Sequence, residues 1–394
     1  MTMVRQFYVV IGLGLCTIPR RLGDSVVIVL GMAIVVGVFV SMMSMVAGLK
    51  GAVEGNGRDD RVIVLRGGSQ YESASSLSMD TVSVISDAPG IEHDANRMPL
   101  ASSEAFELVE LPERAGGDAN IVIRGIKPIG TTVRPEIKLV AGRWFKPGVR
   151  ELVVGSAVQK QFDGVSIGDH IVTTGNNIWT VVGSFESGGS VRESELLTDA
   201  DTLMSAYSRD YFQSVTAIIE SPNSFNSLKM WLSSRPQLTV NVETEKMYLA
   251  SQSRGITEAL RNAALTVGAV MSVGAFFGAL NTMFSAVNKR TVEIATLRAI
   301  GFNPGAVVVS VLVESMLLAT IGGAIGALIA WLIFEGHAAN SVGGGYGQLL
   351  FHLHITMDIV EIALALACIV GLAGGLVPGL RAVQAPIAKT LKGR

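Results

Sequence analysis

The sequence has little charge, few aromatic residues and almost no cysteine. Only 16% of its 394 residues are charged, 6% are aromatic and 49% are hydrophobic. Soluble globular proteins carry about 25% charged residues, so this composition argues against a chain that is soluble throughout. Cys16 and Cys368 both lie in apolar stretches, and the polar middle of the chain has no cysteine. That region is therefore expected to fold without disulfides.

Several chemical motifs are also missing. A phosphate-binding P-loop needs Gly-Lys followed by Ser or Thr, and the sequence contains no Gly-Lys dipeptide. The HExxH motif is absent, and no Ser/His/Asp or Cys/His arrangement is discernible. His352 and His354 form a His-x-His pair near Glu335 and Asp358, but no second spaced pair supports a metal site. We expect no catalytic residue, no bound metal and no nucleic-acid partner.

Four apolar runs account for the high hydrophobic content, and each reaches the ~20 residues needed to cross a bilayer. The runs cover roughly residues 25–47, 262–287, 306–334 and 359–380, and none of them has Lys or Arg in its interior. They predict transmembrane helices over residues 24–48, 259–287, 304–335 and 358–380. The fold class expected is a membrane α-helical protein with four transmembrane helices and a large α+β extracytoplasmic domain between the first and second.

Basic residues are distributed unevenly around these runs. The loop over residues 336–357 has no Lys or Arg, whereas the other flanks carry Arg5, Arg20, Arg21, Lys289, Arg290, Arg298, Arg381, Lys389, Lys392 and Arg394. By the positive-inside rule, both termini and residues 288–303 are cytoplasmic, and residues 49–258 and the 336–357 loop lie on the outer side.

The two ends of the chain are read as cytoplasmic segments. The apolar stretch over residues 4–18 is short and is interrupted by Pro19-Arg20-Arg21, with no small-residue cleavage pattern after it. We interpret residues 1–23 as an amphipathic elbow helix on the membrane face. Residues 381–394 are expected to form a cytoplasmic tail.

The large outer region has a mixed pattern of short strands and helices between turn residues. Strands are predicted over residues 61–65, 105–109, 121–125, 151–155, 170–174, 179–185, 215–220 and 239–243. Helices are predicted over residues 79–88, 156–162, 196–206 and 224–234, and a further helix runs from residue 245 into the second span.

Residues 288–303 form a short charged segment between two long apolar runs. Asn288 or Thr291 could cap a helix there, Gly301 supplies a left-handed stop, and Pro304 follows. The segment is apolar on several sides, so we expect it to contact another protein. The residues expected to make this contact are Asn288, Lys289, Arg290, Glu293, Ile294, Leu297, Arg298 and Gly301.

Polar and small residues inside the predicted spans are also candidates for function. Glu314 lies near the start of the third span, where a carboxylate is costly unless it has a partner. It could bond Asn281 or Ser285 across a helix interface, or pair with Arg298. The motifs Gly274-x-x-x-Gly278 and Gly322-x-x-x-Gly326 suit close helix contacts, within one subunit or with a dimer partner.

Several stretches of the sequence resemble the MacB/FtsX-type ABC transporter permeases. In the outer region these are AGRWF at 141–145, ELVVGS at 151–156, and VSIGD and WTVVGSF between 165 and 185. The segments at 18–38, 288–302, 313–331 and 377–394 resemble the family's first span, coupling segment, third span and closing tail. Asp24 stands where the family commonly has a small or basic residue.

The resemblance implies a bacterial inner-membrane permease that couples ATP hydrolysis to motion of a periplasmic domain, or mechanotransmission. Its partners would be a cytoplasmic ABC ATPase dimer, the lipid bilayer and a second permease subunit, identical or paralogous. ATP and magnesium would bind to the ATPase, which is supplied in trans because this chain lacks a P-loop. Glu314 matches an acidic position common in the family.

The resemblance leaves more than one function open. We favour export of a substrate from the periplasm or outer leaflet, which would add a membrane-fusion protein and an outer-membrane channel as partners. The alternatives are lipoprotein release, or signalling in which the permease controls a cell-wall hydrolase. Cell-division permeases usually carry a smaller outer domain, which favours transport.

Overall fold

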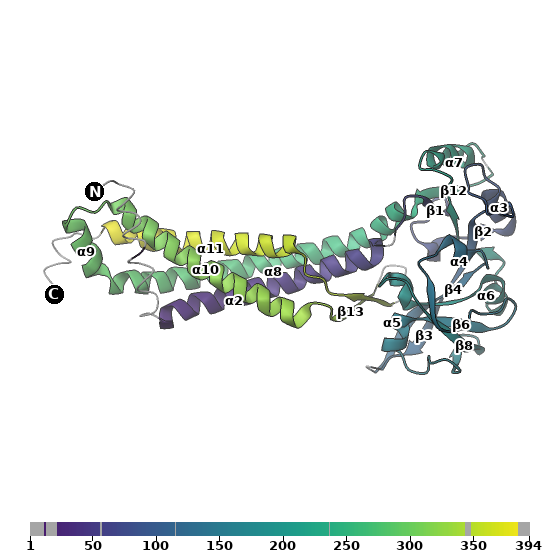
Figure 1. The fold of residues 1–394 in the computed structure, drawn as a ribbon, viewed down its shortest axis with the longest axis horizontal. Coiled ribbons are helices and arrows are strands. Elements are labelled where there is room, and N and C mark those ends of the chain that lie inside the picture. The colour runs from purple at the N-terminus through teal and green to yellow at the C-terminus, as the bar shows by residue number, and fades with distance from the viewer. Residues whose placement is uncertain are drawn as a thin grey trace. The chain divides into compact units, whose positions relative to one another are not determined.

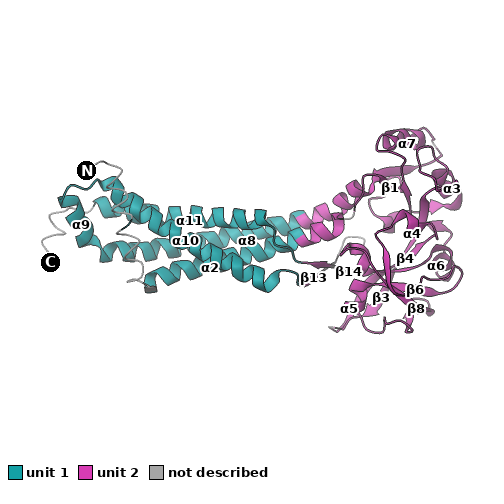
Figure 2. Ribbon diagram, viewed as in Figure 1, with its two compact units in different colours: residues 1–47, 258–337, 353–394 teal, residues 48–257, 338–352 magenta. Residues whose placement is uncertain are grey.

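The computed structural model describes residues 12, 22–55, 57–114, 116–235, 237–342 and 348–384. Of the elbow helix predicted over residues 1–23, only Gly12, Leu22 and Gly23 are among them, and the predicted tail lies outside them beyond residue 384. The chain divides into two compact units, shown in Figure 2. The helical unit comprises Met1–Ala47, Glu258–His337 and Leu353–Arg394. The sheet unit comprises Gly48–Thr257 and Ala338–His352.

Four long helices run through the helical unit (Figure 1), and each is long and apolar enough to cross a membrane. They are α2 (Leu22–Glu54), α8 (Glu245–Lys289), α10 (Pro304–Phe334) and α11 (Met357–Gln384). Helices α2 and α8 are longer than the predicted spans, because their ends belong to the sheet unit. The four helices flank the large α/β domain as predicted, with that domain between α2 and α8.

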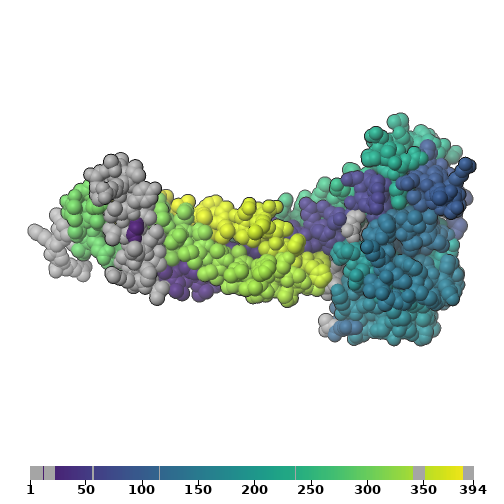
Figure 3. Space-filling model, viewed as in Figure 1, coloured from purple at the N-terminus to yellow at the C-terminus, as the bar shows by residue number. Residues whose placement is uncertain are grey.

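Glycines bring the helix backbones of this unit close together. A Cβ added at Gly322 would lie 2.5 Å from the carbonyl oxygen of Val29, and one at Gly326 would lie 2.2 Å from that of Ala33. Helix α10 therefore packs on α2 within one chain through the predicted small-residue motif. Helices α10 and α11 also adjoin along their length, as the space-filling view shows (Figure 3).

The sheet unit is built on a mixed ten-stranded sheet. Two strand pairs, β4–β9 and β6–β8, are parallel, and the other pairs are antiparallel. Strand β7 (His170–Thr173) pairs with β8 beside the main order. In spatial order the other strands are β12 (Val240–Thr244), β1 (Arg61–Arg66), β11 (Ser214–Ile218), β3 (Ala101–Pro112), β4 (Asp118–Ile126), β9 (Glu195–Asp199), β6 (Glu151–Gly155), β8 (Asn177–Glu186) and β5 (Lys138–Gly142).

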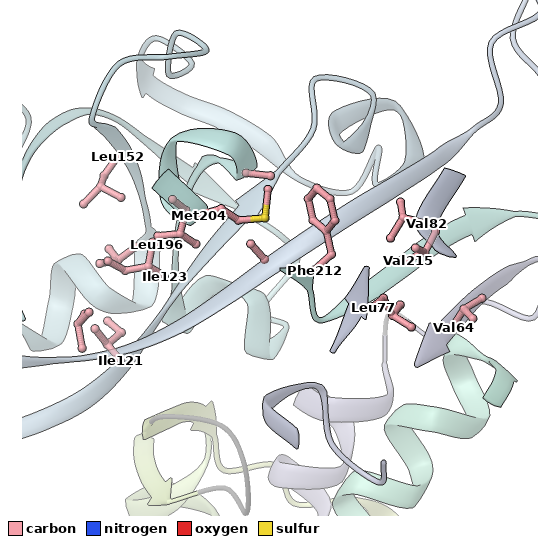
Figure 4. Close-up of a cluster of buried hydrophobic side chains, with 14 of the residues drawn as sticks. Val64, Leu77, Val82, Ile121, Ile123, Leu152, Leu196, Met204, Phe212 and Val215 are labelled. Carbon is pink, nitrogen blue, oxygen red and sulfur yellow. The ribbon is translucent and has the colours of Figure 1, made fainter. Parts of the chain in front are cut away.

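Short helices and an apolar core complete this unit. The core includes Ile121 on β4, Leu152 on β6, Leu196 on β9 and Val215 on β11 (Figure 4). The small two-stranded sheets are β2 (Leu77–Ser78) with β10 (Tyr211–Phe212), and β13 (Ala338–Val342) with β14 (Gln348–His352). The helices are η2 (Glu72–Ala74), α3 (Met79–Ser86), α4 (Gly130–Val133), α5 (Ser156–Gln161), η3 (Val191–Ser194), α6 (Ala200–Ala206) and α7 (Ser224–Ser233).

The helix predicted over residues 196–206 is wrong over its first four residues. Glu195–Asp199 forms strand β9 between β4 and β6, and helix α6 starts only at Ala200. Leu196 and Leu197 are both fully buried, one in each of two core clusters. The tertiary environment thus outweighs local propensity. The hairpin β13–β14, within a predicted loop, and strand β5 were also missed.

A cluster of buried charges connects the central strands of the sheet unit. Arg124 on β4 donates to Glu72 at 2.8 Å, to Glu104 at 2.8 Å and to Glu195 at 2.8 Å. All four side chains are at least 96% buried. Ser214 on β11 donates a further hydrogen bond to Glu72. Buried charges are tolerated only when they are paired in this way.

The arginines keep these carboxylates ionised. Burial alone would raise the pKa of Glu72, but the charge of Arg124 and its hydrogen bonds lower this pKa to about 2. Burial also disfavours the charged form of Glu104, yet the charges of Arg134 and Arg124 hold its pKa below the usual value. Opposite charge therefore outweighs desolvation at both sites.

This electrostatic arrangement predicts acid sensitivity of the sheet unit. Unfolded glutamate titrates near pH ~4.3. The folded pKa values of Glu72 and Glu104 are lower, so their ionised forms stabilise the fold above that pH. This stabilisation is lost as the pH falls toward 2. Urea unfolding of the full chain in detergent, followed by tryptophan fluorescence, should show declining stability from about pH 5 to pH 3.

The variant Glu72→Gln provides the control for this prediction. It removes one titrating carboxylate, so it should be less stable than the wild type at neutral pH and should lose less stability on acidification. A wild-type unfolding free energy that stays constant over this pH range would contradict the prediction.

Candidate functional site: the α9 segment

Helix α9 (Thr291–Ala299) lies between the ends of α8 and α10. It is shorter than the helix predicted over residues 288–303, because Asn288 and Lys289 continue α8. The predicted caps are also wrong: Arg290 occupies the N-cap position and has no capping side-chain bond. The Thr291 hydroxyl instead donates back to the carbonyl oxygen of Asn288 at 2.6 Å.

The end of α9 forms as the sequence indicates. Gly301 has a φ of +100°, the left-handed conformation that glycine adopts readily. The amide of Phe302 donates to the carbonyl oxygen of Leu297 at 3.1 Å, which closes the last turn. Asn303 then caps α10 by accepting a 2.8 Å bond from the Gly305 amide, and Pro304 occupies the first position of that helix.

The residues of α9 divide between a packed side and an exposed side. Ile294 and Ala295 are buried at 7% and 4% exposure, and Ile294 packs with residues of α2, α8, α10 and α11. On the other side, Val292 and Ile300 are 59% and 71% exposed, and Glu293 lies exposed beside Val292. The helix is thus anchored to the bundle while it presents apolar side chains and a carboxylate outward.

An ion pair joins the start of α9 to α10. Arg290 Nη1 donates to Glu314 Oε2 at 2.9 Å, and the two side chains are 12% and 6% exposed. The sequence named Asn281, Ser285 and Arg298 as possible partners of Glu314, and the structure adds Arg290. Asn281, one of those candidates, is exposed on α8. The separation of 24 residues explains the miss, since no local spacing rule brings Arg290 and Glu314 together.

A second ion pair joins the end of α8 to the start of α2. Lys289 Nζ lies 2.5 Å from Asp24 Oδ2, and the Lys289 side chain is 55% exposed. Asp24 is the position that departs from the residue types common in the resembling family. The ion pair with Lys289 gives a structural reason for an acidic residue at this position, although exposed ion pairs contribute only about 0–1 kcal/mol to stability. Both basic residues before α9 thus contact acidic residues of the bundle.

A cavity of about 480 Å³ opens between α8, α9 and α10. Its walls are mainly apolar, with Val287, Leu297 and Val311 among them, and the Arg290–Glu314 pair adds charge. Within the described ranges, no group of three His, Cys, Asp or Glu side chains could hold a metal ion. The chemistry that the cavity offers is therefore that of a packing surface with one fixed ion pair.

The remaining residues predicted for this segment differ in their exposure to solvent. Arg298 and Leu297 are half-buried, and Asn288 and Gly301 are exposed.

Elsewhere in the helical unit, His354 Nδ1 lies 2.7 Å from Glu335 Oε1, and the two side chains form an ion pair when the histidine is protonated. Of the His-x-His pair, His354 thus contacts one carboxylate.

The Arg290–Glu314 pair can be tested with a double-mutant cycle. Glu314→Gln leaves the Arg290 guanidinium without its buried carboxylate, which costs about 3–5 kcal/mol when one partner of such a pair is removed. Arg290→Gln should destabilise comparably, and the double variant should lose clearly less than the sum. Thermal unfolding of the full chain in detergent measures this. Additive losses would show that the two side chains do not interact.

Comparison with known families places this geometry in context. Residues 25–235 match the family described as the MacB-like periplasmic core domain, which alone covers more than half of the chain. Residues 265–387 match the FtsX-like permease C-terminal family, which includes α9 and Glu314. No curated protein shows significant similarity to the chain.

Solved structures add only distant likenesses. The extracellular domain of the noncanonic ABC-type transporter YknZ from Gram-positive bacteria is 15% identical, with a TM-score of 0.36 over 46% of this chain and 99% of that one. The periplasmic region of MacB from Actinobacillus actinomycetemcomitans is 14% identical, with a TM-score of 0.37 over 52% and 93%. The family matches carry the assignment and confirm the resemblance: the chain belongs to the MacB/FtsX-type ABC transporter permeases.

Proposed function

We propose that this permease couples ATP hydrolysis by a separate ABC ATPase to movement of its sheet unit. Family membership implies an ABC ATPase partner. The observation that carries the proposal is the division of α9 into a buried side with Ile294 and an exposed side with Val292, Glu293 and Ile300. ATP and magnesium bind to the partner, and this chain supplies the docking and transmitting surfaces.

The geometry around α9 suits the transmission of force. Few residues separate α9 from α8 and α10, so a push on α9 reaches both helices. The Arg290–Glu314 pair also ties the start of α9 to the third turn of α10. A partner that displaces the exposed side must therefore displace the two spans as well, because close-packed helices do not deform freely.

The positions of the basic residues support the orientation of this proposal. Lys289, Arg290 and Arg298 lie at or near α9, whereas residues 336–357 have no Lys or Arg. In a bacterial inner membrane this distribution favours a cytoplasmic α9, cytoplasmic termini and a periplasmic sheet unit. An ATPase in the cytoplasm would then meet α9 directly.

A second permease subunit is part of the proposal. The apolar window of α8 is only 17% buried, against 39% in each of the other three long helices. A groove of about 300 Å³ runs between α2 and α8, and it includes Gly31, Gly274 and Gly278. A Cβ at any of these glycines would meet no other atom within 4 Å. A helix of a second subunit, identical or paralogous, would fit such a small-residue surface.

The transported substrate is proposed at the level of its location. The match to the MacB-like periplasmic core domain favours export from the periplasm or outer leaflet over hydrolase signalling. An exporter would recruit a membrane-fusion protein and an outer-membrane channel, whereas a lipoprotein-release machine would pair with a similar permease. Helices α10 and α2 pack closely at Gly322 and Gly326. We therefore expect movement of the sheet unit, rather than passage between these helices, to drive export.

Charge reversal on α9 tests the coupling role. Glu293→Lys and Arg298→Glu should each lower permease-dependent ATP hydrolysis by the reconstituted complex about tenfold, or ~1.4 kcal/mol. Glu220→Lys, which reverses an exposed charge in the sheet unit, is the matched control. Wild-type hydrolysis and function in both α9 variants would remove the case for this helix as the coupling element.

The dimer groove can be tested by filling it. Gly278→Leu should reduce the fraction of permease dimer, because the added side chain occupies the space that the second helix requires. Gly255→Leu is the control, since it lies on the same helix outside the groove and also has open space. Light scattering of the detergent-purified chain measures the mass, and equal dimer fractions in both variants would contradict the proposed interface.

A further inference from the structure

The start of α8 is attached directly to the sheet. Strand β12 ends at Thr244 and α8 begins at Glu245, with no residue between them. Strand β1 pairs with β12 and places Val62 opposite Thr244. Since β1 begins shortly after the end of α2, the sheet ends of both helices emerge from two neighbouring strands. The remainder of α8 continues unbroken to Lys289.

The first residue of α8 is a buried carboxylate held by two arginines. Glu245 is 3% exposed. Its Oε2 accepts from Arg61 Nε at 2.6 Å, and its Oε1 accepts from Arg134 Nη1 at 2.9 Å. Arg61 Nη2 also donates to Glu136 at 2.6 Å. We call Arg61, Arg134, Glu136 and Glu245 the joint cluster.

The joint cluster reaches several strands. Arg134 Nη2 donates to Glu104 on β3 at 2.8 Å and to Thr216 on β11 at 2.9 Å, and Arg61 belongs to β1. A single carboxylate at the N-terminus of α8 is thus connected to the three strands that follow β12 in the sheet. An acidic residue at this end of a helix also interacts favourably with the helix dipole.

The end of α2 is held against the same helix. Ser253 on α8 donates to Glu54, the last residue of α2, at 2.6 Å. Gly57 lies so close to α8 that an added Cβ would be 2.9 Å from the Lys246 Cα. Lys246 Nζ also lies 2.9 Å from Asp59 in the connection to β1. The sheet ends of α2 and α8 therefore pack against each other beside the joint cluster.

Stability alone is a poor explanation for charges at this joint. Replacing a buried ion pair with apolar side chains of similar volume is often neutral or stabilising, whereas directional pairs fix one geometry. Because its two oxygens bond different arginines, Glu245 bridges Arg61 and Arg134, and this restrains both the position and the rotation of the first helical turn.

We propose that Glu245 is a positioning residue that locks the first turn of α8 to the sheet, so that the β12–α8 junction does not act as a hinge. Its role in transmission rests on the proposed function. A rigid junction passes a displacement of α8 to β1, β3 and β11 together, whereas a flexible junction would absorb that displacement.

Hydrogen exchange on the full chain in detergent tests this lock. Glu245→Gln should speed amide exchange in the first turns of α8 at least tenfold. Glu195→Gln is the matched control, because it removes a buried carboxylate from Arg124, and Glu195 bonds to Arg124 and Arg192, neither of which belongs to α8. This control should accelerate exchange around β4 and β9 and leave α8 within about twofold of the wild type. Equal acceleration of α8 in both variants would overturn the lock.

A milder variant guards against loss of folding. Glu245→Asp keeps the charge but is one methylene shorter, so it cannot hold both arginines, and exchange in the first turns should rise to an intermediate level. Wild-type exchange there would also overturn the proposal.

A second experiment uses the complex with its ATPase. It should show ATP-dependent exchange differences in the sheet unit, and Glu245→Gln should abolish these differences without slowing hydrolysis. If the wild type lacks such differences, the proposed function is wrong. The exchange rates of the variants measured without ATP still test whether Glu245 holds the first turn of α8.

Discussion

Pairs of buried charges lie at both ends of α8, the longest helix among the described residues. Glu245 begins α8 between Arg61 and Arg134, and Arg290, immediately after α8, pairs with Glu314 on α10. A buried charge without a partner is strongly unfavourable, so each pair restricts the geometry of its surroundings. Between these pairs, α8 is one uninterrupted helix of 45 residues. The residues at each end of α8 are thus held by ion pairs within their own compact unit.

The sequence predicts the parts of the fold that depend on composition and local pattern. The four apolar runs, the left-handed Gly301 and most strands of the sheet unit follow from length, hydropathy and turn residues. Strand β9 was mistaken for helix because its central position between β4 and β6 is a property of the sheet. Local sequence contains no signal of that environment.

The contacts of the α9 site and of the joint cluster were harder to predict, because their partners are far apart in the chain. Arg61 and Glu245 are separated by 184 positions, and no spacing rule connects them. Identical spacing also hides different roles. Gly322 and Gly326 pack on α2, whereas Gly274 and Gly278 face open space beside it. The intramembrane carboxylate was found from its cost in lipid, but its partner Arg290 required the structure.

We propose that α9 recruits an ABC ATPase to this permease. The most direct test is purification of the tagged, full-length protein from its own cells, with identification of every protein that accompanies it. An ABC ATPase should accompany the wild type and should be lost or depleted with Glu293→Lys. Recovery of intact permease without any ATPase would contradict this role and would show that α9 serves another purpose.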